Sequence, residues 1–306
     1  MTTSESALRR DRALGALLGL ACGDAVGTTV EFEARGTFEP VTDMVGGGPF
    51  SLAAGQWTDD TSMALCLATS LVHRGGFDPA DQMNRYVNWW QWGYLSSTGE
   101  CFDIGFTTAK ALQRYQATGD PYAGDTDPRS AGNGSLMRLA PVALHFLSDR
   151  AALRQNARLS SMTTHAAVEA VDACELFADL LARAIDGDAK SSLWATPRDA
   201  HLSATVRNAA DPSLRDRTAD EIRSSGYCID SLEAALWCFA RSSSFETTIL
   251  TAANLGGDAD TVAAIAGQLA GAHYGASAIP PRWLERLAMR GEIERLAESL
   301  LTTLPG

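Results

Sequence analysis

The chain has 306 residues and a mass of 32.5 kDa, and 45% of its residues are hydrophobic, which is enough to bury a sizeable core. Its net charge of -12 and isoelectric point of about 4.8 argue against a surface that holds nucleic acid by neutralising phosphates. No stretch has the uninterrupted apolar length of a membrane span, and the six cysteines form no CxxC pair. We therefore expect a cytoplasmic protein with reduced, buried thiols and no membrane contact.

The first predicted element is a helix over residues 13–22, although the arginines before it imitate the start of a secretory leader. Its apolar residues repeat at helical spacing, which favours a core helix: Leu14, Leu17, Leu18 and Ala21. Three glycines four residues apart leave one face of this helix smooth, so that another helix can approach closely: Gly15, Gly19 and Gly23.

Helical periodicity dominates the rest of the chain, and the alternation typical of strands is scarce. Further helices are predicted over 62–72, 80–92, 107–116, 136–146, 151–159, 164–185, 229–239, 247–255 and 261–273. The polar interval 186–225 still contains recurring apolar residues, so we interpret it as a surface elaboration of one domain. We predict a compact all-α helical bundle, a single domain over 8–303, with residues 1–7 as a disordered tail.

Two short acidic clusters stand immediately before predicted helices. The first is Trp57-Thr58-Asp59-Asp60-Thr61, and the second is Gly256-Gly257-Asp258-Ala259-Asp260-Thr261. Helix capping would explain either cluster alone, because Asp and Thr are favoured at helix N-termini. One Asp suffices for a cap, however, and each cluster carries two. The duplication therefore indicates two halves of one metal site at helix N-termini.

The ligands in these clusters are all oxygens, which selects hard cations such as Mg²⁺ or Mn²⁺. Four carboxylates that meet in space raise one another's pKa unless a cation neutralises them. A dinuclear centre would resolve that conflict.

Two further motifs are candidates for substrate contact. A Gly-rich turn over residues 131–138 feeds a predicted helix, and such turns present backbone N–H groups to phosphate, although Asn-Gly is also an ordinary turn dipeptide. Asp103 stands between Phe102 and Ile104, where an apolar setting would raise its pKa and suit it to acid or base chemistry. A capped structural Asp is a comparable interpretation.

Together these motifs resemble the ADP-ribosylglycohydrolase family, in its bacterial branch typified by dinitrogenase reductase-activating glycohydrolase. The resemblance runs from about Ala13 to Gly275. It rests on five motifs in family order, at residues 15–25, 55–61, 132–138, 163–165 and 254–261.

The resemblance implies an all-α hydrolase with two Mg²⁺ or Mn²⁺ ions that cleaves the N- or O-glycosidic bond between ADP-ribose and a modified target. The implied metal ligands are Thr58, Asp59, Asp60, Asp258, Asp260 and Thr261. The implied substrate contacts are Gly132, Asn133, Gly134, Ser135, His165 and Tyr227, with Tyr227 near the adenosine end. Glu31 matches an acidic residue that lies at the metal centre and guards its entrance.

The catalytic residues implied in the same way are Asp103 and Glu31, together with Asp59 and Asp60 at the metals. Asp103 matches the acid that approaches the anomeric ribose, and Glu31 is the alternative base. The chain departs from the branch at Phe106, where many members carry Asn. This departure bears on the target group more than on the chemistry.

The bacterial branch favours an ADP-ribosylated arginine of a protein as substrate, with ADP-ribose as product. Separately from the resemblance, we expect a monomer. Alternatives are serine-linked ADP-ribose, a modified nucleobase, O-acetyl-ADP-ribose, or a binder of ADP-ribose without turnover. A class I terpene synthase is also all-α with Asp-rich metal motifs, but it needs a further Asp after Asp60, and Met63 and Ala64 stand there instead. The sequence therefore disfavours that class of enzyme.

Overall fold

The computed structural model describes residues 3–193 and 201–302, and in these ranges it contains helices and three isolated bridges but no strand. The all-α prediction is confirmed. The α-helices are α1 Thr3–Gly27, α2 Asp59–Arg74, α3 Pro79–Trp92, α4 Phe106–Thr118, α5 Ala140–His145, α6 Arg150–Met162, α7 Val168–Asp186, α8 Lys190–Leu193, α9 Ala204–Ala209, α10 Cys228–Arg241, α11 Phe245–Ala253, α12 Ala259–Tyr274, α13 Pro281–Arg286 and α14 Arg290–Thr302. Short 3-10 turns include η1 Thr28–Val30 and η3 Pro212–Asp216.

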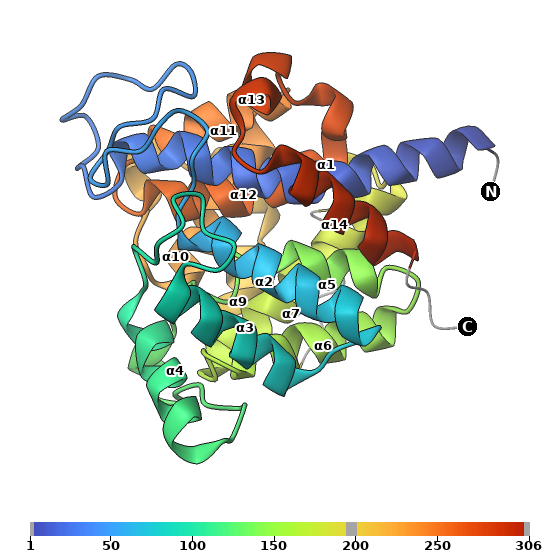
Figure 1. The fold of residues 1–306 in the computed structure, drawn as a ribbon. Helices are drawn as coiled ribbons and strands as arrows, with labels where there is room; N and C mark the ends of the chain where they lie inside the picture. Colours follow the sequence, from blue (N-terminus) through green and yellow to red (C-terminus); the bar gives the residue numbers. More distant parts are fainter. Residues whose placement is uncertain (1–2, 194–200, 303–306) are drawn as a thin grey trace.

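Helices α1 and α12 form an antiparallel pair at the centre of the molecule (Figure 1). The predicted smooth face of α1 is the face that meets α12. A Cβ atom on Gly19 would lie 2.3 Å from the carbonyl oxygen of Gly267, and one on Gly23 would lie 2.1 Å from that of Ala263. No side chain fits at such distances, so the two backbones touch directly.

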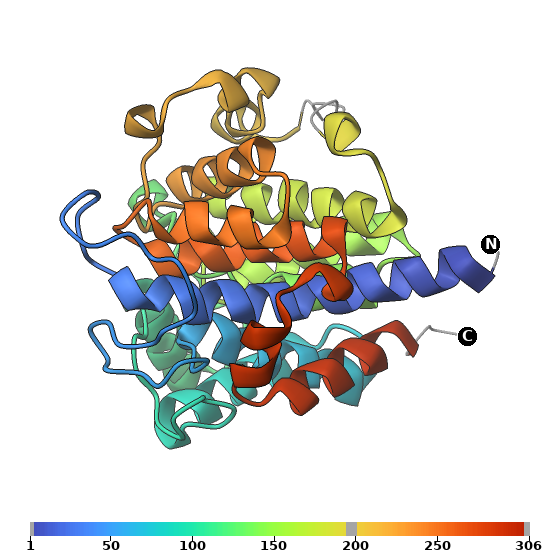
Figure 2. The same ribbon diagram turned by 90° about the horizontal axis from the view of Figure 1, so that it is seen from above.

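The remaining helices surround this pair (Figure 2). Helices α7 and α10 pack on α12, while α2 and α14 lie on the other side of α1. The elaboration predicted over 186–225 lies at the outer edge, where α9 and η3 pack on α10 through buried Val206 and Leu214. Part of it, residues 194–200, lies outside the described residues.

Several predicted boundaries differ from the structure. Residues 136–138 form turns and α5 begins only at Ala140, whereas a helix was predicted from residue 136; α7 begins at Val168, four residues after its predicted start. Both displaced segments belong to the site described below, where loops are needed. Residues 3–7 are helical, although they were expected to belong to a disordered tail over residues 1–7; residues 1–2 lie outside the described residues. Just after this segment, ion pairs of Arg9 with Asp186 and of Arg10 with Glu298 connect the helix to the body.

The apolar segment of α1 is long enough to cross a membrane, but 89% of it is buried inside the protein, as expected for a core helix. The cysteines agree with the expectation of buried thiols. All six are unpaired, five are buried, and Cys101 is half-buried.

Candidate active site

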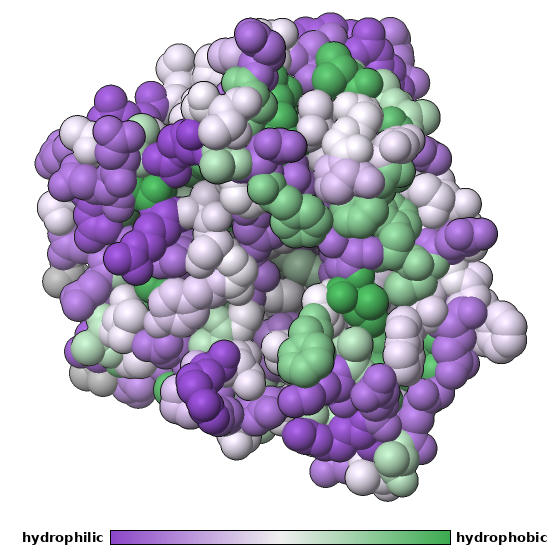
Figure 3. All heavy atoms as spheres, turned by 90° about the vertical axis from the view of Figure 1, so that its left-hand side faces the viewer, coloured by the Kyte–Doolittle hydropathy of each residue, from purple (hydrophilic) through white to green (hydrophobic). Residues whose placement is uncertain are grey.

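The site lies where the C-terminal end of α1 and the N-terminal ends of α2 and α12 come together. Gly27 at the end of α1 contacts the backbone of Ala259 and Asp260 at the start of α12. The face that contains these helix ends is hollowed near its centre (Figure 3). The two acidic clusters, about two hundred residues apart in the chain, therefore meet on one side of the molecule.

The carboxylates form two overlapping groups. Oxygen atoms of Asp24, Asp60 and Asp260 all lie within 4.8 Å of one another, and so do those of Glu31, Asp103 and Asp260. Asp260 belongs to both groups. Two cation positions that share a carboxylate therefore fit this arrangement.

The predicted threonines lie among these carboxylates. The Thr58 hydroxyl is 3.2 Å from both Asp60 and Asp260, and the Thr261 hydroxyl is 3.2 Å from Asp60. These contacts join the cluster of α2 to the cluster of α12. Four of the six metal ligands that the resemblance implies therefore contact one another. The other two, Asp59 and Asp258, line the adjoining cavity, so all six lie at one site.

Asp24 is a site residue that the sequence-based prediction does not include. One of its oxygens accepts hydrogen bonds from the backbone N–H and the hydroxyl of Thr58, at 2.9 and 3.0 Å. The other accepts the same pair from Thr61, at 3.0 and 2.6 Å. Asp24 therefore fixes the loop that begins α2 to the body of α1. Its signal in the sequence is a single acid within the apolar stretch of the first helix.

Glycines shape the loop that precedes α12 and carries the second acidic cluster. Gly256 and Gly257 have φ angles of 67° and 65°, which favour glycine, and a Cβ on Gly257 would lie 2.2 Å from the carbonyl oxygen of Ser224. The amide of Phe32 donates to the Gly257 carbonyl at 2.7 Å, and the Gly257 amide donates to Glu33 at 2.8 Å. This pairing places Glu31 over the start of α12.

Burial and mutual repulsion disfavour the charged form of these acids. Burial, with repulsion from Asp260 and Asp103, raises the pKa of Glu31 to about 12. Burial, with repulsion from Asp24 and Asp258, raises the pKa of Asp103 to about 7. Burial and neighbouring carboxylates also raise the pKa values of Asp59, Asp60 and Asp260. A bound cation would reverse these shifts by pairing the charges.

The donor set fits a hard divalent cation. All donors are carboxylate or hydroxyl oxygens, and one oxygen each of Asp260 and Glu31 is buried without a hydrogen-bond partner. An unpartnered buried carboxylate oxygen is costly, and coordination to a cation would satisfy it.

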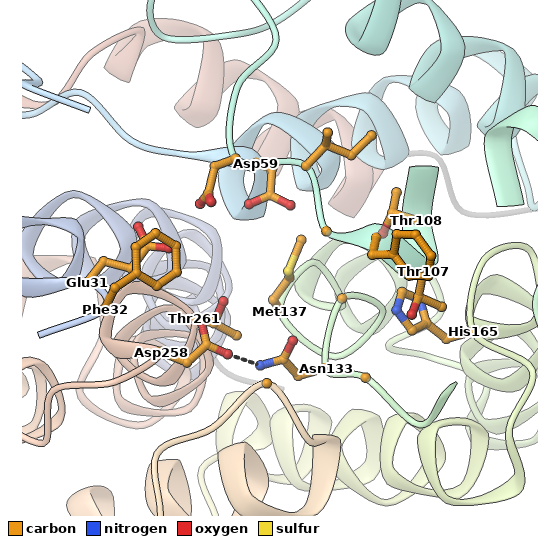
Figure 4. Close-up of a pocket in the computed structure, with 17 residues that line it drawn as sticks. Glu31, Phe32, Asp59, Thr107, Thr108, Asn133, Met137, His165, Asp258 and Thr261 are labelled. Atoms are coloured by element: carbon orange, nitrogen blue, oxygen red, sulfur yellow. Dashed lines mark hydrogen bonds between the residues drawn. The ribbon is translucent and has the colours of Figure 1, made fainter. Parts of the chain in front are cut away.

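A cavity of about 390 Å³ opens beside the acidic groups. Figure 4 shows Glu31, Asp59 and Asp258 toward one side, with His165 on the other. Between them lies Asn133, whose side-chain amide donates to Asp258 at 2.6 Å. The cavity thus has an acidic end and an end formed by neutral groups.

The Gly-rich turn forms part of the neutral end. A Cβ on Gly134 would lie 2.7 Å from the His165 ring, so glycine is required there. The amides of Gly132 and Asn133 donate to the carbonyl oxygens of Ser130 and Gly226. Those of Gly134 and Ser135 form no hydrogen bond within residues 3–193 and 201–302, and of these two residues Gly134 lines the cavity, so its amide is the one that can face a ligand.

Two predicted substrate contacts do not line this cavity. The Ser135 side chain is buried and hydrogen-bonded to Ser161 at 2.8 Å, and Ser135 is not among the residues that line the cavity. Tyr227 pairs its backbone with Gly132, and its hydroxyl donates to Glu169. Its ring is half-buried outside the lining residues.

Comparison with known proteins identifies the family. The ADP-ribosylglycohydrolase family matches residues 5–305. The chain belongs to this family.

Individual relatives cover nearly the whole chain. It is 49% identical to the ADP-ribosylarginine hydrolase Tri1 of Pseudomonas putida (strain GB-1), over 99% of this chain and 81% of that protein. It is 44% identical to the protein of the same name from Serratia proteamaculans (strain 568), over 96% of this chain and 80% of that protein.

A more distant relative is the ADP-ribosyl-(dinitrogen reductase) glycohydrolase of Rhodospirillum rubrum, which is 35% identical over 95% of this chain and 96% of that protein. A solved chain of an ADP-ribosylglycohydrolase-related protein complex superposes with a TM-score of 0.87 at 48% identity. It covers 96% of this chain and 98% of that chain.

Proposed function

We propose that this ADP-ribosylglycohydrolase removes ADP-ribose from arginine side chains of modified proteins, with two divalent cations, Mg²⁺ or Mn²⁺, in the acidic cluster. The observation that carries the proposal is the meeting of two overlapping carboxylate groups with the Gly-rich turn and His165 around one cavity. The names of the two most similar relatives reported above support arginine as the target.

The cavity has the groups that ADP-ribose requires. The free amide of Gly134 suits a phosphate oxygen, and the His165 ring lies beside it. Asp258, held by the Asn133 amide, lies at the acidic end. The anomeric ribose carbon would then lie at the acidic end, with the diphosphate toward the Gly-rich turn.

The mouth of the cavity suits a cationic guanidinium. Phe32 and Phe106 line the cavity and are 67% and 73% exposed. Exposed aromatic faces bind cations, and arginine stacks on them readily. Lys110 already places its ammonium group 4.7 Å from the centre of the Phe106 ring. An arginine of the target protein could approach between these rings and the acidic groups.

Hydrolysis breaks the bond from the anomeric carbon to the arginine nitrogen and forms one to a water oxygen. A divalent cation bound in the cluster supplies positive charge that polarises ribose oxygens and acidifies water. Asp103 and Glu31 lie within 4.8 Å of Asp260 and face the same space, so either carboxylate can accept the proton of the attacking water. The arginine nitrogen takes up a proton as it leaves.

The test measures release of free ADP-ribose from a mono-ADP-ribosyl-arginine protein, with Mg²⁺, with Mn²⁺, and with a chelator. We expect release with a divalent cation and none with the chelator. The Asp258→Ala variant should lose release, because it removes a carboxylate at the start of α12.

The same assay distinguishes the alternatives. Release from serine-linked or nucleic-acid-linked substrates, or from O-acetyl-ADP-ribose, without release from arginine would reject the proposed target and retain the hydrolase. Cation and ADP-ribose binding without release from any substrate would indicate a binding protein.

A further inference from the structure

A fully buried arginine lies behind the substrate cavity. Arg138 follows the cavity-lining Met137 and is 0% exposed. Its contacts are with uncharged groups: the Thr164 hydroxyl, the Ser160 carbonyl, the Met63 sulfur and the Tyr86 ring, whose centre lies 4.6 Å away. Burying a cation among neutral groups is costly, which calls for a reason beyond packing.

Arg138 is connected to His165 through one hydroxyl. The Arg138 Nη2 atom lies 2.7 Å from Thr164 Oγ1, and Thr164 Oγ1 lies 2.8 Å from His165 Nδ1. Both Thr164 and His165 are buried, at 0% and 3% exposure. The other ring nitrogen, Nε2, lies 3.2 Å from where a Cβ of Gly132 would stand, on the side that lines the cavity.

The direction of these two hydrogen bonds follows from the chemistry of the groups. A guanidinium can only donate, so Thr164 Oγ1 accepts from Arg138. The hydroxyl has a single proton, and the partner left for it is His165 Nδ1. If Nδ1 also carried a proton, Oγ1 would accept twice and its own proton would be left without this partner.

From this geometry we propose that Arg138 and Thr164 are positioning residues that fix His165 in one tautomer. Nδ1 is bare, and the ring proton is on Nε2, which faces the cavity. His165 is therefore a neutral donor to an oxygen of ADP-ribose, a ribose hydroxyl or a phosphate. This assignment of an acceptor rests on the proposed function.

The electrostatic environment is consistent with a neutral ring. Burial and the nearby Arg138 charge lower the pKa of His165 to about 3. His165 thus stays uncharged at neutral pH and provides a directed donor without the pH dependence of an ordinary histidine.

The first test observes the tautomer directly. NMR of the full chain with isotope-labelled histidine separates protonated from bare ring nitrogens, and the signal lost in His165→Gln assigns those of His165. We expect a bare Nδ1 and a protonated Nε2 at neutral pH. A protonated Nδ1 in the wild-type chain would overturn the proposal, and the variant serves only to assign the signals, since the tautomer is measured in the wild-type chain.

The second test removes the relay. Thr164→Val replaces the hydroxyl with a methyl group of similar size, so the Nδ1-protonated form should appear and calorimetric affinity for free ADP-ribose should fall roughly tenfold, as for loss of a directed hydrogen bond. Thr164→Ser should restore the wild-type tautomer. Arg138→Met removes the donor to Thr164 Oγ1 at the other end of the relay, and the Nδ1-protonated form should appear in this variant as well.

An unchanged tautomer in both Thr164→Val and Arg138→Met would contradict a positioning role. Neither readout involves cleavage of an arginine linkage. A failure of the proposed hydrolysis would therefore leave the tautomer result intact, and the reverse also holds.

Discussion

One carboxylate inside the first helix connects three parts of the site. Asp24 accepts hydrogen bonds from Thr58 and Thr61, and the Thr58 hydroxyl is in turn within reach of Asp60 and Asp260. Groups that hold metal ligands in this way commonly change affinity 10–100-fold when they are replaced.

We predict that Asp24→Asn lowers affinity for Mn²⁺ by roughly 10–100-fold, because an amide has one acceptor oxygen where the carboxylate has two. Calorimetric titration of the full chain with Mn²⁺ measures the effect. Asp172→Asn is the matched control, since Asp172 is also buried and accepts a backbone N–H, from Ser203. Equal affinities in the two variants would contradict a role for Asp24 at the metals.

A second prediction concerns the mouth of the cavity. Phe106→Ala should raise KM for an ADP-ribosyl-arginine protein by about 2- to 30-fold, the range expected for an aromatic–cation contact. Affinity for free ADP-ribose should not change, because that ligand lacks the guanidinium. Trp92→Ala removes an equally exposed aromatic that does not line the cavity, and it should leave both values as they are. An equal loss toward both ligands would show that Phe106 contacts ADP-ribose instead.

Residues that would touch a metal or the substrate directly were easier to predict than residues that act through others, even where both lie in the same motif. The two acidic clusters carry more carboxylate than caps need, and the structure brings them together. Asp24 and Arg138 each look ordinary in the sequence, as one polar residue in an apolar stretch. Their partners come from distant segments, and only the packed fold shows them. Ser135 illustrates the opposite error, since its motif position does not reveal that its side chain bonds Ser161.

At the scale of elements, the contact between α1 and α12 depends on the absence of side chains. We predict that Gly19→Ala lowers the free energy of unfolding by about 1–3 kcal/mol, because the new Cβ would lie 2.3 Å from the Gly267 carbonyl oxygen and the helices must move apart. Thermal or urea unfolding measures the change. Gly291→Ala, on α14 with open space around it, should be neutral or stabilising by up to about 1 kcal/mol. Similar destabilisation in both would exclude the close approach as the cause.

Most helices could be predicted from apolar periodicity, and the exceptions have physical causes. Residues 164–167 have helix-compatible composition but form the loop that carries His165, because the tertiary contacts of Thr164 and His165 outweigh local preference. Helix α14 is absent from the predicted elements, although its buried residues stand at helical spacing: Ile293, Leu296, Ala297 and Leu300. Its apolar residues are interspersed with many charged residues, which weakens the periodic signal.

At the scale of the whole molecule, Asp43 ties the long loop between α1 and α2 to the C-terminal region. It lies 3.0 Å from both Arg282 and Arg286 and accepts a hydrogen bond from the buried Trp283 indole. Burial opposes its ionisation, but these hydrogen bonds outweigh burial and lower the pKa of Asp43 from 3.8 to about 2.

A folded-state pKa below the unfolded value stabilises the protein above the unfolded pKa, and this stabilisation is lost as the pH falls through the folded pKa. We therefore predict that Asp43→Asn lowers the free energy of unfolding by about 1–3 kcal/mol at neutral pH. The difference from wild type should shrink between pH 3.8 and about 2. Urea unfolding across this range measures it, with exposed Glu39→Gln as the control. A difference that does not depend on pH would contradict the ionic origin.

The pairing of the first helix with a helix near the end of the chain has a consequence during synthesis. About 230 residues separate Gly27 from Ala259, so the ribosome takes roughly 10–50 s to make the principal partner of α1 after α1 itself. Throughout that interval an apolar segment, 89% of which is buried in the finished protein, lacks its principal cover. Packing of α1 against its principal partner therefore waits until the segment that forms α12 has been made.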